Sequence, residues 1–125
     1  MKNNSKDSKI VLVIEDDFDL LWLISKLLHF HGYKVLTAVT ASQGLDFFSR
    51  NAFKLNAVIL DLTLPDASGE ELAEEILKVF PEMPIIITTG EDDIAQKNAL
   101  LNKGVKAYLV KPFDLNSLIT ILTTL

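Results

Sequence analysis

Residues 10–17 have the sequence IVLVIEDD, in which five consecutive aliphatic residues are followed by three acids. A short run of this kind is typical of a β-strand that is covered on both faces. The same pattern recurs three times, where residues 57–60 lead into Asp61, residues 85–88 into Thr89 and residues 107–110 into Lys111. If the runs are parallel strands, their carboxyl ends meet at one edge of a sheet, where open α/β sheets bind ligands. We therefore expect acids, a hydroxyl and an amine to converge at that edge.

The segments between these runs have the spacing of amphipathic helices. The expected strands are 10–14, 33–39, 57–60, 85–88 and 107–110, and the expected helices run from Leu20 to Gly32, over 41–50, 70–80 and 92–102, and onward from a cap at Asp114. Five strands that alternate with five helices through right-handed crossovers predict a doubly wound, three-layer α/β sandwich over residues 9–125. Residues 1–8 are polar, and we expect a disordered leader there.

The composition limits the classes of function that the chain can have. With 125 residues we expect one domain, and 12 basic against 17 acidic side chains give a net charge of -5. This charge argues against non-specific binding to nucleic acid or to anionic lipid. The chain has no cysteine, which excludes disulfides and thiolate metal sites. No apolar run has the length of a membrane span, so we expect a cytoplasmic domain with neither a membrane nor a nucleic acid as partner.

The residues expected at the sheet edge suit phosphoryl chemistry. Carboxylates from two strands, Glu15 and Asp16 from the first and Asp61 from the third, would form an all-oxygen site of the kind that Mg²⁺ prefers. A lysine beside such a site, here Lys111, can neutralise phosphoryl oxygens, and Asp61 can attack phosphorus. Each residue alone has a simpler interpretation, such as a helix cap for Asp17, which we leave out of the ligand set. The conjunction of matched residues at the ends of separate strands favours the functional interpretation.

Several motifs of the chain match one known family of signalling domains. These motifs are Ile14-Glu15-Asp16-Asp17, Leu60-Asp61-Leu62-Thr63-Leu64-Pro65-Asp66, Thr88-Thr89-Gly90-Glu91 and Tyr108-Leu109-Val110-Lys111-Pro112-Phe113. From about Lys9 to Leu125 the chain resembles a receiver domain of a two-component response regulator, with the chemotaxis-type receiver fold. The resemblance implies a flavodoxin-like sheet with the strand order 2-1-3-4-5.

The same resemblance implies a role for each site residue. Asp61 would accept a phosphoryl group from the phosphohistidine of a histidine kinase or a histidine phosphotransfer protein. Lys111 would pair with the phosphoryl oxygens, and the peptide bond from Lys111 to Pro112 would be cis. The implied protein ligands of Mg²⁺ are Glu15 through water, Asp16, Asp61 and the backbone carbonyl of Thr63. Thr89 would donate its hydroxyl to the phosphate and Tyr108 would turn inward in response, so that the face of the fourth helix, fifth strand and fifth helix signals to a partner or output domain.

Other interpretations and partners stay open at this point. The runner-up function is a phosphorylation-independent interaction module of the same fold, and a Mg²⁺-dependent phosphatase ranks last because no second acid is positioned as a general base. We expect catalysis of the chain's own phosphorylation and dephosphorylation only, with no turnover of an external substrate. Ser68 stands where relatives often have an acid or an amide, which leaves the rigidity of its loop open.

Two helices suggest contacts with other molecules. The first helix is expected to turn a stripe of Leu20, Leu23 and Leu27 inward and Trp22 outward on the opposite side. There Trp22 would either help dock a helical phosphodonor or merely cover a loop. The last helix carries no charge after Asp114, and Ile121 is expected to face away from an inner stripe formed by Leu115, Leu118, Ile119, Leu122 and Leu125. Either a homodimer through the last two helices or a longer protein would cover such a helix.

Overall fold

The computed structural model describes residues 9–125, which form one five-stranded parallel sheet with the strand order β2-β1-β3-β4-β5. The strands are β1 (Ile10–Ile14), β2 (Lys34–Ala38), β3 (Leu55–Asp61), β4 (Ile85–Thr89) and β5 (Ala107–Val110). The predicted fold class and strand order are therefore confirmed. The expected leader, residues 1–8, lies outside the described residues.

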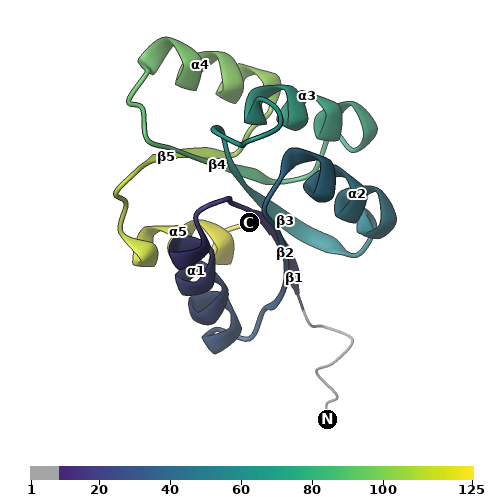
Figure 1. Cartoon of the computed structure of the whole chain (residues 1–125), viewed down its shortest axis with the longest axis vertical. Helices are drawn as coiled ribbons and strands as arrows, with labels where there is room; N and C mark the ends of the chain where they lie inside the picture. The colour runs from purple at the N-terminus through teal and green to yellow at the C-terminus, as the bar shows by residue number, and fades with distance from the viewer. Residues whose placement is uncertain (1–8) are drawn as a thin grey trace.

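Five helices cover the two faces of this sheet. They are α1 (Phe18–Phe30), α2 (Ala41–Asn51), α3 (Gly69–Val79), α4 (Ile94–Lys103) and α5 (Leu115–Thr123). Figure 1 shows α1 and α5 on one face of the sheet and α2, α3 and α4 on the other. Within residues 9–125, every helix is too short or too polar to cross a membrane.

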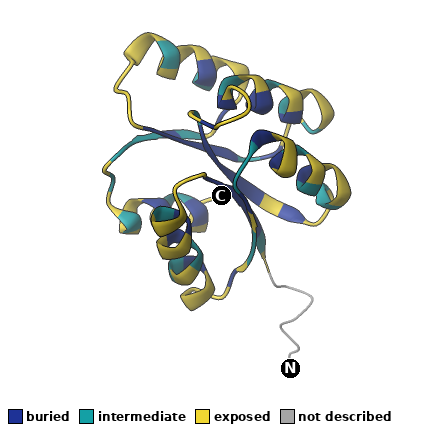
Figure 2. Cartoon of the chain, in the orientation of Figure 1, coloured by how far each residue is buried: buried dark blue, intermediate teal, exposed yellow. Residues whose placement is uncertain are grey.

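The core is divided by the sheet into two apolar clusters. In Figure 2 the central strands are almost continuously buried, as expected for strands that helices cover on both faces. Phe48, Ile76 and Leu100 bring α2, α3 and α4 into one cluster, and Ile24 and Leu118 bring α1 and α5 into the other. The sheet is thereby held between two helical layers, and its carboxyl edge carries the residues that follow the strands.

The inner stripe of α1 differs from the one expected. Leu21, Ile24 and Leu28 are the buried residues of this helix, whereas Leu23, which we expected inside, is 47% exposed. Several aliphatic residues follow one another in α1, so helical spacing alone allows two neighbouring stripes. The outward position of Trp22 is confirmed, with 60% of its surface exposed.

The last helix also corrects an expectation. Leu118, Ile119 and Leu122 are buried as predicted, but Ile121 is half-buried and packs against the cluster between α1 and α5. Leu125, expected on the inner face, is 44% exposed and lies beyond the end of α5. The apolar character of Ile121 is thus satisfied within the chain and does not by itself call for a partner.

Side chains just ahead of the helices define where these begin. Asp17 accepts hydrogen bonds from the backbone N–H groups of Asp19 and Leu20, which confirms its role as the cap of α1. Asp114 accepts in the same way from the N–H of Asn116 at the start of α5. The carboxylate of Asp17 caps α1 and does not belong to the cluster of acids that follows β1 and β3.

Candidate functional site

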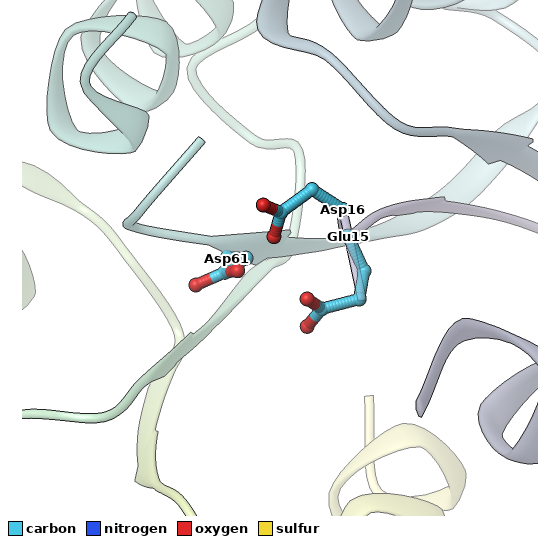
Figure 3. A group of neighbouring side chains, drawn as sticks. All are labelled: Glu15, Asp16 and Asp61. Atoms are coloured by element: carbon cyan, nitrogen blue, oxygen red, sulfur yellow. The ribbon is translucent and has the colours of Figure 1, made fainter. Parts of the chain in front are cut away.

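Three carboxylates meet where β1 and β3 end. The two strands are adjacent, with Ile14 paired to Leu60, so the acids that follow lie side by side. Figure 3 shows Glu15, Asp16 and Asp61 gathered at this edge, and one carboxylate oxygen of each lies within 4.8 Å of the others. Glu15 and Asp61 are buried, whereas Asp16 is exposed. The site therefore combines two buried acids, Glu15 and Asp61, with one acid that is exposed to solvent, Asp16.

Lys111, which directly follows β5, pairs with the two buried acids of this cluster. Its Nζ lies 3.0 Å from Oε1 of Glu15 and 3.3 Å from Oδ2 of Asp61. Burial by itself lowers the pKa of Lys111, but the hydrogen bond and attraction of Glu15, with those of Asp61, outweigh it and raise the pKa above the ordinary 10.5. The peptide bond from Lys111 to Pro112 is cis, as the resemblance implied. Lys111 thus stays protonated and supplies the site's nearest positive charge.

Glu15 carries a strongly perturbed carboxyl group. Burial is the largest cause, and the negative charge of Asp61 adds to it, so the pKa rises from 4.5 to about 7 even though the N–H of Asp17 and the ammonium of Lys111 oppose the shift. Apart from the ion pair, Oε1 of Glu15 has no hydrogen-bond donor among the described residues. The single positive charge of Lys111 therefore neutralises the negative charge of the two buried carboxylates only in part.

The raised pKa makes a prediction about stability and pH. Between pH 4.5 and about 7 the folded chain binds a proton on Glu15 that the unfolded chain releases, so this group makes unfolding easier as pH rises through that range. We expect Glu15→Gln, without added metal, to stabilise the protein at pH 8 by up to about 3 kcal/mol, with a gain that shrinks toward pH 5.

Urea unfolding at pH 5, 6.5 and 8 in the presence of a chelator measures this difference. Glu71→Gln, at an exposed position of α3, is the matched control and should follow the wild-type protein at every pH. An equal stability difference at pH 5 and pH 8 for Glu15→Gln would contradict the assignment of the raised pKa to this residue.

Thr89 is the last residue of β4, and Tyr108 is the second residue of the neighbouring strand β5. Thr89 is buried, follows the residue that pairs with Asp61, and accepts a hydrogen bond on Oγ1 from the N–H of Glu91 at 3.1 Å. Tyr108 is also buried, and its hydroxyl donates to Oε1 of Gln96 at 3.0 Å. Tyr108 is therefore already inward in this structure, so its burial alone does not report a switched state.

The loop between β3 and α3 is more ordered than the sequence indicated. The N–H of Thr63 donates to Oδ1 of Asp61 at 3.1 Å, and Thr63 forms an antiparallel bridge with Ser68. Ser68 caps α3 by accepting from the N–H of Glu70. Sequence reasoning left the rigidity of this loop open and missed Asp66, whose contacts with α2 span 24 and 25 residues and have no local signal.

Together, the sheet and its edge define a flavodoxin-like domain in which two buried acids, an exposed acid and a lysine share one site. A family model described as the response regulator receiver domain matches residues 11–123. The chain therefore belongs to the receiver domains of two-component response regulators.

The chain spans about a quarter to a half of the length of the curated relatives that it matches. The chain is 38% identical over 108 residues to the transcriptional regulatory protein GlrR of Escherichia coli (strain K12). This match covers 86% of the chain but only 24% of GlrR. A crystal structure of a receiver domain protein from Clostridium thermocellum has a TM-score of 0.88 and 34% identity, and the match covers 93% of this chain and 92% of that one.

A third relative was crystallised in a modified state. It is a response regulator protein from Burkholderia pseudomallei with a phosphorylated aspartic acid, a calcium ion and citrate. Its TM-score is 0.81 at 28% identity, and the match covers 92% of this chain and 66% of that one.

Proposed function

We propose that this receiver domain takes a phosphoryl group onto Asp61 from a phosphohistidine donor and passes the change on to a partner or output domain. The observation that supports this most strongly is the setting of the Asp61 carboxylate. It is buried at the end of β3, with the ammonium of Lys111 at 3.3 Å and two further acids beside it. The phosphorylated aspartic acid of the Burkholderia relative supports the same chemistry.

The carboxylate of Asp61 and the ammonium of Lys111 are the groups that would carry out the transfer. An oxygen of Asp61 forms the new bond to phosphorus while the bond from phosphorus to the donor imidazole nitrogen breaks, and the electron pair of that bond returns to the imidazole. The ammonium of Lys111, already 3.3 Å from Oδ2 of Asp61, faces the phosphoryl oxygens as charge accumulates on them. We expect no external substrate to be turned over, because the phosphoryl group stays on the chain's own carboxylate until water removes it.

The acid cluster fits Mg²⁺ as the cofactor. Its donors are all oxygens, it contains neither histidine nor cysteine, and Oε1 of Glu15 has only one compensating neighbour. Asp16, Asp61 and the backbone carbonyl of Thr63 would hold the ion, and Glu15 would bind through water. The bound ion would supply positive charge to the phosphoryl oxygens.

Thr89 and Tyr108 are proposed to carry the response away from the site. Thr89 Oγ1 accepts from the N–H of Glu91, and a phosphoryl group on Asp61 would take the hydroxyl hydrogen of Thr89 as a donor. The hydroxyl of Tyr108 lies within hydrogen-bond distance of the carbonyl oxygen of Glu91 in the same loop, at 3.2 Å, and of Oε1 of Gln96 in α4, at 3.0 Å. A local charge change at Asp61 would thereby bias how α4, β5 and α5 pack, which is the face proposed to signal.

Labelling with a small phosphodonor tests the proposal directly. Incubation with acetyl phosphate should give one acyl phosphate per chain, detected by intact mass, and a chelator should prevent it. Absence of incorporation would overturn the proposal in favour of a phosphorylation-independent interaction module. Continuous release of phosphate far above the rate of loss from the labelled chain would instead favour a phosphatase.

The phosphodonor is proposed to dock near α1. Trp22 and Phe18 are exposed on this helix, and Lys26 Nζ lies 5.6 Å from the centre of the Trp22 ring. Phe18, Leu21 and Trp22 line a hollow of about 500 Å³ on α1. An exposed tryptophan beside an apolar hollow is the kind of residue that dominates protein contacts.

We expect Trp22→Ala to weaken transfer from a histidine kinase by about tenfold or more, as for a contact hot spot. The probe is the autophosphorylated core of any histidine kinase that labels the wild-type chain, and the rate is measured under limiting receiver. Labelling by acetyl phosphate should not change. Phe53→Ala removes an aromatic residue that is even more exposed, just after the end of α2, and should leave both rates unchanged. Transfer to Trp22→Ala at the wild-type rate would remove Trp22 from the interface.

A homodimer through α4 and α5 and a cytoplasmic location remain predictions. Sedimentation with and without beryllofluoride tests the first, and self-association in neither state would contradict it. The chain spans only 24% of GlrR, so an output domain that responds to this receiver domain is likewise a proposal.

A further inference from the structure

The loop that carries Thr63 is folded back on itself and anchored at its base. Thr63 bridges Ser68, and the N–H of Gly69 donates to the carbonyl of Leu62 at 2.9 Å. Leu64 turns its side chain into the core, where it is 9% exposed. The tip of the loop, residues 65–67, is exposed. Packing in the core therefore does not fix its position, which depends on contacts with neighbouring elements.

Asp66 at this tip is bound to the start of a different helix. Its Oδ1 accepts from the N–H of Ala41 at 2.8 Å, and its Oδ2 accepts from the N–H of Ser42 at 3.0 Å. These are N–H groups of the first turn of α2, which have no partner inside the helix and face an anion favourably. Both bonds lower the pKa of Asp66, which shows that its charged form is the one that is held.

The N-cap of α2 does not duplicate this contact. Thr40 Oγ1 accepts from the N–H of Gln43 at 3.0 Å, which is the third N–H of the helix. Thr40 therefore serves α2 locally, whereas Asp66 serves it from 24 and 25 residues away. The two residues share one helix end but only Asp66 joins that end to the loop after β3.

Helix α2 is in turn fixed against the strand that leads to Glu15. Gly44 packs so closely on Ile14 that a Cβ atom at Gly44 would lie 2.5 Å from the Ile14 Cδ1 atom. Phe48, one turn further on, is 1% exposed in the core. The segment before Glu15 and the loop that contains Thr63 are thus both positioned by α2.

We infer that Asp66 is a positioning residue that clasps the β3–α3 loop to α2, and thereby sets the affinity of the acid site for Mg²⁺ without touching the ion. This inference rests on the proposed function, because it takes Thr63 as a ligand. Loss of the clasp would free the loop tip and raise the entropic cost of bringing Thr63 to the metal.

Isothermal titration of the whole chain with Mg²⁺ tests the inference. Asp66→Ala should weaken binding by about tenfold, as other residues that orient metal ligands do. At saturating Mg²⁺ its rate of labelling by acetyl phosphate should return to the wild-type value, because the phosphoacceptor itself is intact. Asp66→Asn keeps one acceptor oxygen for two N–H groups and should bind Mg²⁺ with an intermediate affinity.

Thr40→Ala is the matched control, since it removes a hydrogen bond from the same end of α2 without freeing the loop. It should lower the urea midpoint yet bind Mg²⁺ as the wild-type chain does. Wild-type affinity in Asp66→Ala, or equal weakening in Thr40→Ala, would overturn the inference and leave Asp66 as an ordinary helix cap. Failure of the wild-type chain to bind Mg²⁺ would instead overturn the proposed metal site, and this inference with it.

Discussion

Asp61→Asn is expected to abolish phosphoryl incorporation, from acetyl phosphate and from a kinase alike, while the protein stays folded. The amide has the shape of the carboxylate but lacks the anionic oxygen that attacks phosphorus. Asp61 is buried and shares Lys111 with Glu15, so its replacement removes one of two acids that compete for a single ammonium. We therefore expect the free energy of unfolding at pH 8 to be unchanged or higher.

Intact mass after acetyl phosphate treatment measures incorporation, and urea unfolding measures stability. Asp46→Asn is the control, because Asp46 is exposed on α2 and paired only with Arg50, and it should label fully. Persistent acyl phosphate in Asp61→Asn would assign the phosphoacceptor to another carboxylate, with Asp16 as the first alternative.

The sheet and its site were predictable because their signals are local. Each strand is an apolar run that ends at a residue with distinct chemistry, so the positions of Asp61 and Lys111 followed from where the runs stop. Once parallel order is assumed, these ends meet at one edge, and the ion pairs of Lys111 confirm that they do. The identity of the cap Asp17 was predictable for the same reason, since capping involves only neighbours in sequence.

What escaped prediction depends on contacts across the fold. The inner stripe of α1 was misplaced because several aliphatic neighbours satisfy helical spacing equally, and only packing on the sheet decides that Leu23 stays outside. The bond from the Tyr108 hydroxyl to Gln96, 12 residues earlier, likewise has no local signal. The clasp of Asp66 depends on how closely α2 approaches the β3–α3 loop, which no local pattern records.

Gly69→Ala is expected to be the most disruptive small substitution near the site. A Cβ atom at Gly69 would lie 2.6 Å from the Cα atom of Leu62, and closer still to the carbonyl oxygen of Asp61. Both are backbone atoms, so no side-chain rotation relieves the overlap, and either β3 or the start of α3 must move. We expect a loss of stability of about 2 to 3 kcal/mol, in the range of overpacked sites, together with slow phosphorylation because the moved backbone carries Asp61.

Gly90→Ala separates this steric effect from a general cost of replacing glycine. Nothing lies within 4 Å of a Cβ atom at Gly90, although this residue also borders the site, so the substitution should leave the free energy of unfolding within about 0.5 kcal/mol of wild type. Urea unfolding of both variants gives the comparison. Because the overlap would move the backbone that carries the phosphoacceptor Asp61 itself, adding Mg²⁺ should not restore the labelling rate of Gly69→Ala, in contrast to Asp66→Ala. Equal stability of the two glycine variants would contradict this prediction, because it would show that the backbone at the end of β3 moves at little energetic cost. Such a backbone could not hold Asp61 in a fixed position for attack.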